Sequence, residues 1–152
     1  MLWNLSNALH SLAAVIWVGG MFFAYMALRP AMADVPKEDR LALWRRTLQR
    51  FLRWVAIMVV VIWATGIYMM FFVLSGFGAA GIHVDTMFTL ALIMTGLFFW
   101  LNHGPFRRFR DAADARDFDT AGGIIETIRK IVATNLALGL LTVVVAAWGA
   151  AG

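Results

Sequence analysis

Residues 54–74 read WVAIMVVVIWATGIYMMFFVL and carry no Asp, Glu, Lys or Arg. An α-helix rises about 1.5 Å per residue, so a run of this length crosses the ~30 Å hydrocarbon core of a bilayer. Residues 1–28, 86–106 and 131–152 also lack these four residue types. Because lipid offers the backbone no hydrogen-bond partners, each of the four runs is predicted to be a membrane-spanning helix.

The composition leads to the same fold class. The chain has 152 residues, of which 62% are hydrophobic and 14% charged. A soluble domain of this size would lack the polar side chains to cover its surface. We therefore predict one all-α domain over residues 1–152, a polytopic bundle of four transmembrane helices. These helices are predicted at about residues 5–28, 38–74, 85–103 and 120–150, with Asp119 or Thr120 as N-cap of the last.

The second helix is predicted to begin well before its uncharged run. From Glu38 onward apolar residues recur at helical spacing, at Leu41, Trp44, Leu48 and Leu52, with arginines between them. We interpret this segment as an amphipathic extension of the helix into the cytoplasm. Its arginines are expected to contact solvent and lipid headgroups.

The positions of the charged residues predict the orientation. All 13 Lys and Arg lie in residues 29–53 and 107–130, with every acidic residue except Asp85. Basic connecting segments stay on the cytoplasmic side of a membrane. The N-terminus, the 75–85 loop and the C-terminus are therefore predicted to lie outside. We expect a multi-pass protein of the bacterial inner (plasma) membrane.

The same pattern limits the partners. The sequence pI of about 10.3 follows from this topology, so it does not point to nucleic acid. The lipid bilayer is the expected environment, and a second copy of the chain or another membrane protein is left open as a partner.

Residues 1–28 could also be interpreted as a signal peptide. Ala31-Met32-Ala33 has the form of a signal-peptide cleavage site, but no basic segment precedes the long apolar run. We therefore interpret residues 1–28 as a spanning helix.

Three histidines lie in or beside the predicted membrane helices, where ionisable side chains usually serve a function. At 1.5 Å per residue, His10 lies about 28 Å and His83 about 36 Å from the cytoplasmic ends of their helices. Asp85 lies at about 33 Å and His103 at only about 6 Å. We therefore expect His10, His83 and Asp85 to share the outer end of the bundle, and His103 to lie apart.

Methionines add sulfur ligands to this outer group. Met69 and Met70 end the second helix, and Met87 follows Asp85. Imidazole and thioether together suit copper, and thioether selects Cu(I). The predicted metal ligands are His10, His83, Asp85 and Met87. Each residue also has a structural interpretation, in which the methionines and histidines pack and Asp85 caps a helix.

The first helix carries the most specific string of residues. His10 is followed by Trp17, Gly19 and Gly20, and the glycines allow close approach of a flat porphyrin or of another helix. We therefore predict a cofactor site at His10, Trp17, Gly19 and Gly20, with packing through small residues as the alternative. On the last helix Asn135, Gly139 and Thr142 form a polar and small stripe, expected to face the interior and to bond across helices.

These motifs resemble a known membrane family. Ala8-Leu9-His10, Trp17-Val18-Gly19-Gly20, Leu28-Arg29-Pro30 and the run from Asn135 to Leu140 are similar to the copper-resistance protein D (CopD-like) family. The first helix is also similar to HemJ-type protoporphyrinogen oxidase, a four-helix protein with haem b. That resemblance implies His10 as the essential histidine and matches His83-Val84-Asp85 to a His-x-Lys motif, with Asp85 where that family has Lys.

Three hypotheses about function follow. The first is copper handling at the periplasmic face, by binding, transport or resistance, with a copper ion as cofactor. The second is a b-type haem redox protein with His10, and His83 as the second candidate, as axial ligands. The third is a structural or accessory subunit. We do not expect an enzyme, since no hydrolase triad or phosphate-binding loop appears. If it were one, a haem-dependent oxidoreductase would be the class.

Overall fold

The structure is a computed structural model that describes residues 1–74 and 81–149. Within these residues the chain forms helices joined by short turns, and it forms no strand. The helices are α1 (Leu2–Phe23), the π-helical turn η1 (Ala24–Leu28), α2 (Arg29–Ala31), α3 (Lys37–Phe72), α4 (Ile82–His103), α5 (Pro105–Asp114) and α6 (Phe118–Gly149). The predicted all-α fold is confirmed. Part of the predicted outer loop, residues 75–80, lies outside the described residues.

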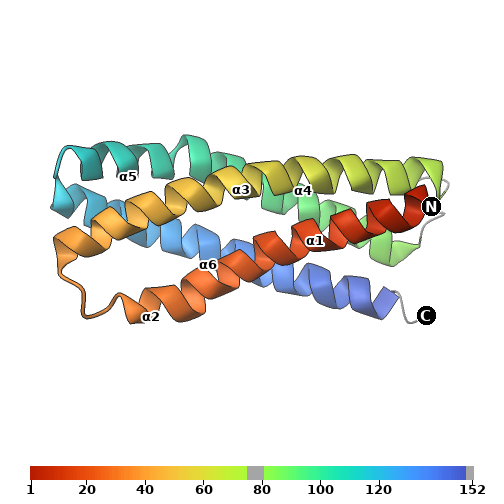
Figure 1. Cartoon of the computed structure of the whole chain (residues 1–152), viewed down its shortest axis with the longest axis horizontal. Coiled ribbons are helices and arrows are strands. Elements are labelled where there is room, and N and C mark those ends of the chain that lie inside the picture. Colours follow the sequence, from red (N-terminus) through yellow and green to blue (C-terminus); the bar gives the residue numbers. More distant parts are fainter. Residues whose placement is uncertain (75–80, 150–152) are drawn as a thin grey trace.

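The helices form one elongated bundle (Figure 1). Among the described residues, four helical segments are long and apolar enough to cross a membrane, namely Leu2–Ala31, Lys37–Phe72, Ile82–Asp114 and Phe118–Gly149. Large apolar side chains such as Val60 and Val144 are more than half exposed on their outer faces. A bilayer would cover these side chains. The prediction of a polytopic four-helix membrane protein is therefore confirmed.

Two helix pairs build the bundle. The main contacts join α1 to α3 and α4 to α6, and α5 also packs on α6. Gly139 on α6 permits close approach of its neighbours, because an added Cβ would lie 2.8 Å from Val18 on α1 and 3.2 Å from Met94 on α4. Trp63 on α3 donates a 3.0 Å hydrogen bond from Nε1 to the Thr95 hydroxyl on α4. Side chains thus connect the two pairs across the interior.

The predicted amphipathic extension of the second spanning helix forms the first part of α3. The helix begins at Lys37, one residue before the predicted start. Four residues of its apolar stripe are buried, namely Leu41, Trp44, Leu48 and Leu52. Their helical spacing puts them on one face, and burial of that face against the bundle keeps the segment helical.

Two helix starts differ from the predictions, and one additional helix is present. α4 begins at Ile82, three residues before the predicted start, after Gly81 with a φ of +91°. The charged segment after Pro105 contains the additional helix α5, which buries Phe106 and Phe109. α6 begins at Phe118, and Asp117 precedes it and accepts a 3.1 Å hydrogen bond from the Thr120 backbone N–H. The capping side chain is therefore Asp117, not Asp119 or Thr120.

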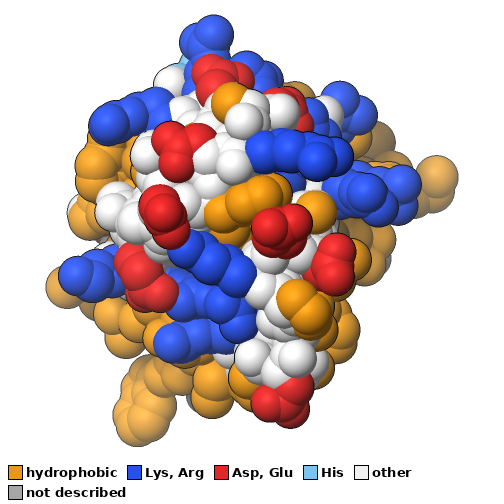
Figure 2. Space-filling model, turned by 90° about the vertical axis from the view of Figure 1, so that its left-hand side faces the viewer, with side chains coloured by type: hydrophobic (Ala, Val, Ile, Leu, Met, Phe, Trp, Pro, Cys, Tyr) orange, Lys and Arg blue, Asp and Glu red, His pale blue; other side chains and the backbone are white. Residues whose placement is uncertain are grey.

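Charged side chains gather at one end of the bundle (Figure 2). We call this the charged end; it holds the connection between α2 and α3 and the connection between α5 and α6. Lys37 pairs with Asp119 at 2.6 Å and Arg45 with Asp114 at 2.8 Å. Hydrogen bonds from the Thr120 side chain and backbone lower the pKa of the Asp117 carboxyl. The start of α1 and the end of α6 lie at the opposite end of the bundle (Figure 1).

The two adjacent glycines of α1 offer a matched test of this packing. A Cβ added at Gly20 would collide with the Phe51 ring, whereas one added at Gly19 would meet no atom within 4 Å. Both Gly→Ala changes gain the same helix propensity, about 1 kcal/mol, so the difference between them isolates the collision. We expect Gly20→Ala to be less stable than Gly19→Ala by about 1–3 kcal/mol. Unfolding of both variants in detergent measures this difference, and equal stabilities would contradict the contact.

Candidate metal site

A cavity of about 460 Å³, here called the main cavity, opens among the four spanning helices. It lies toward the end of the bundle opposite the charged end, which we call the cavity end. Large aromatic rings form much of its wall, from Trp3, Trp17, Trp63 and Phe88. Besides the Trp indoles, the described residues bring polar side chains to this wall at Asn7, His10, His83 and Thr142. The main cavity is thus an apolar chamber with a few polar groups.

His10 is held in one orientation by α3. Its Nδ1 lies 3.0 Å from the Thr65 hydroxyl oxygen, and that hydroxyl donates its own proton to the Val61 carbonyl at 2.6 Å. With the Thr65 proton assigned to the Val61 carbonyl, Nδ1 of the neutral His10 ring is assigned as the donor to the Thr65 oxygen. The Nε2 atom then carries the lone pair, which is the form of imidazole that binds a metal. Gly66 gives this ring room, because a Cβ there would lie 3.3 Å from Cε1 of His10.

His83 lines the same cavity from α4. Its ring packs against the backbone of Gly149 on α6, where an added Cβ would collide with it. Gly81, just before α4, also lies against this ring, with its would-be Cβ 3.1 Å from Cε1. The structure therefore brings His10 and His83 to the wall of one cavity from two different helices, as their predicted depths require.

Four methionines line the main cavity as well. Met69 and Met70 come from the end of α3, and Met87 and Met94 from α4. Three of them are buried, all but Met87. The Thr142 hydroxyl on α6 lies 3.9 Å from the Met94 sulfur. The cavity wall thus combines two imidazoles with several thioethers, and Met94 was not among the predicted ligands.

Asp85 lies in the first turn of α4, and the described lining of the main cavity does not include it. Its carboxylate is suited to the positive end of the helix dipole there, while Gly81 occupies the N-cap position. Within residues 1–74 and 81–149, no three residues among His, Cys, Asp and Glu gather closely enough to hold a metal ion. A metal in the main cavity would therefore depend on imidazole and thioether.

The predicted residues of the first helix separate into two groups. Trp17 lines the main cavity and packs edge-on against Phe98 on α4, with ring centroids 6.3 Å apart. Gly20 instead lies against Phe51, and Gly19 faces open space on the outside of the bundle. Neither glycine belongs to the described wall of the main cavity. The haem hypothesis placed both of them against a porphyrin.

His103 lies far from the main cavity, at the last residue of α4. It follows His83 by 20 positions on the same helix, which corresponds to about 30 Å. Its Nδ1 donates a 3.0 Å hydrogen bond to the Phe99 carbonyl oxygen, and the two rings stack with centroids 5.9 Å apart. Its partner is therefore the backbone of its own helix, where the sequence led us to expect a loop or a lipid phosphate.

The fold and the cavity together define a multi-pass membrane protein built as a four-helix bundle. The family model described as copper resistance protein D (CopD) matches residues 45–149. Because this match covers more than half of the chain, the protein belongs to the CopD family, which links it to copper resistance. The match includes most of α3 and all of α4 to α6 but not α1. No curated protein and no solved structure matches the chain.

Proposed function

We propose that this protein binds copper in the main cavity, at the periplasmic face of the bacterial inner membrane, as part of copper transport or resistance. One observation carries the proposal. The imidazole of His10 is oriented by Thr65 and lines a cavity that also presents methionine sulfur from two helices. Second-shell hydrogen bonds of this kind fix the tautomer of metal-binding histidines.

The chemistry of the wall favours Cu(I) over harder cations. Thioether and neutral imidazole are soft or borderline ligands, whereas Mg²⁺ and Ca²⁺ require several oxygen ligands. Neither ligand type carries a charge, so the bound ion would keep its own positive charge in an apolar chamber. A monovalent ion pays a smaller desolvation cost there than a divalent one.

The distribution of charged side chains supports binding of a cation at the cavity end. Every Lys and Arg of the chain lies in residues 29–53 and 107–130, toward the charged end. The cavity end therefore has no basic side chain to repel an approaching cation, and it has the acidic side chain of Asp85 on α4. This arrangement favours entry of a cation from the cavity end.

The experiment combines metal analysis with the optical spectrum of the protein purified from cells grown with copper. We expect at least one copper per chain and no Soret band. A Soret band with little copper would overturn the proposal in favour of the haem b hypothesis. Absence of both, also after anaerobic addition of Cu(I), would overturn it in favour of a structural or accessory role.

A further inference from the structure

A second, much smaller cavity lies deeper in the bundle than the main cavity. It has a volume of about 20 Å³ and shares Trp17 with the wall of the main cavity. We call it the middle cavity; its wall also includes Met21, Phe51, Phe98 and Asn135. Such a volume accepts one particle the size of a water molecule.

Asn135 is the unusual member of this wall. It lies on α6 with 5% of its surface exposed, and its Oδ1 atom accepts no hydrogen bond from the described residues. An amide oxygen buried without a partner costs about 1–3 kcal/mol. Asn side chains inside membrane bundles normally bond to a neighbouring helix. Asn135 therefore carries an unpartnered acceptor and lines a space that holds one small particle.

The rest of the wall indicates which particle fits. A water molecule typically needs about three hydrogen bonds, and the described side chains of this wall offer it only Asn135 and the indole of Trp17. A soft cation has more partners in this wall, because the wall also contains the Met21 thioether and the aromatic rings of Trp17, Phe51 and Phe98.

We infer that Met21 and Asn135 form a second subsite for a soft monovalent cation, Cu(I) or its analogue Ag(I), in the middle cavity. The inference rests on the proposed function, since the main cavity supplies the ion. Met21 follows His10 on the same helix by 11 residues, which places the subsite about 16 Å deeper in the bundle. An ion held there has left the cavity end.

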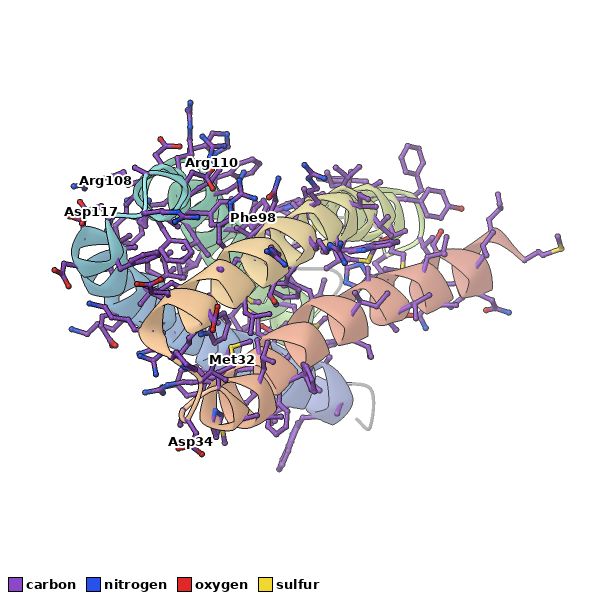
Figure 3. The ribbon with its side chains drawn as sticks, turned by 60° about the vertical axis from the view of Figure 1, so that its left-hand side comes forward. Met32, Asp34, Phe98, Arg108, Arg110 and Asp117 are labelled. Atoms are coloured by element: carbon purple, nitrogen blue, oxygen red, sulfur yellow. The ribbon has the colours of Figure 1, made fainter. Side chains whose placement is uncertain are left out.

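A third cavity, of about 30 Å³, continues the line toward the charged end. It shares Leu48, Phe51 and Val132 with the middle cavity and reaches Arg29. Figure 3 shows Phe98, a wall residue of the middle cavity, set back along the bundle from Arg108 and Arg110 at the charged end. The subsite thus lies on a row of cavities through the bundle, and the Phe51 ring, seated on Gly20, separates it from the charged end.

The test is titration of the detergent-purified full chain with Ag(I) in chloride-free buffer, with bound silver counted after removal of free ion. We expect two equivalents for the unchanged protein. Met21→Leu and Asn135→Leu should each lose one equivalent and keep the other. Met58→Leu is the matched control, since Met58 is buried but lies outside the described walls of all three cavities.

The outcomes separate the two proposals. If Met21→Leu and Asn135→Leu both keep the silver content of the unchanged protein, the subsite does not exist and the middle cavity holds water at most. His10→Ala should lose the other equivalent only. If His10→Ala instead loses none while Asn135→Leu loses one, the middle subsite stands and the proposed function of the main cavity fails.

Discussion

His10→Ala is expected to remove the copper bound in the main cavity, lowering the affinity of that site by at least about 100-fold, since loss of a second-shell partner alone costs about 10–100-fold. His10 supplies an imidazole nitrogen whose lone pair is fixed by the Thr65 hydrogen bond, and Ala offers no replacement. His83 and the thioethers would then have to bind Cu(I) without that nitrogen, and thioethers are individually weak ligands. A competition titration with a Cu(I) chelator measures the affinity.

Two further variants show whether the effect belongs to the cavity. His103→Ala is the matched control. It removes a histidine side chain from the last residue of α4, far from the main cavity, and it should leave copper binding unchanged. Thr65→Val keeps the His10 ring but removes the hydroxyl that orients it, so the affinity should fall by about 10–100-fold. If His10→Ala kept the full copper affinity, the main cavity would not be the copper site.

The spanning helices could be predicted because membrane insertion depends on properties that the sequence displays directly. Four uncharged runs of sufficient length are visible by inspection, and the buried stripe from Leu41 to Leu52 was readable from its period. α5 was missed although its signals were present. Pro105 at a first helical position and the spacing of Phe106 and Phe109 are typical of a short amphipathic helix.

The depth of the candidate residues along the bundle could be predicted, but the direction in which each one faces could not. Distance along a helix places His10 and His83 at one level, and they do line one cavity. Which side of a helix faces inward depends on how the four helices pack, and one uncharged helix has little to distinguish its faces. Asp85 therefore stands at a suitable depth but outside the described cavity wall, and Gly19 and Gly20 lie outside it as well. Thr65 and Met94 were not foreseen as partners.

A labelling experiment is expected to give an all-or-none result that reports the orientation of the bundle in the membrane. The chain contains no cysteine, so one introduced cysteine is the only reactive thiol. Ile82→Cys places it at the cavity end, on a side chain that is 85% exposed. Asp34→Cys places it at the charged end, on the exposed connection before α3 (Figure 3).

A membrane-impermeant maleimide added to cells with a permeabilised outer membrane should label Ile82→Cys fully. It should label Asp34→Cys only after the inner membrane is also opened. The physical reason is that all 13 Lys and Arg lie in the two segments toward the charged end, and basic segments resist translocation across the inner membrane. The reverse labelling pattern would mean that the main cavity faces the cytoplasm. His10 would then receive copper from inside the cell, and the proposed periplasmic entry of the ion would be excluded.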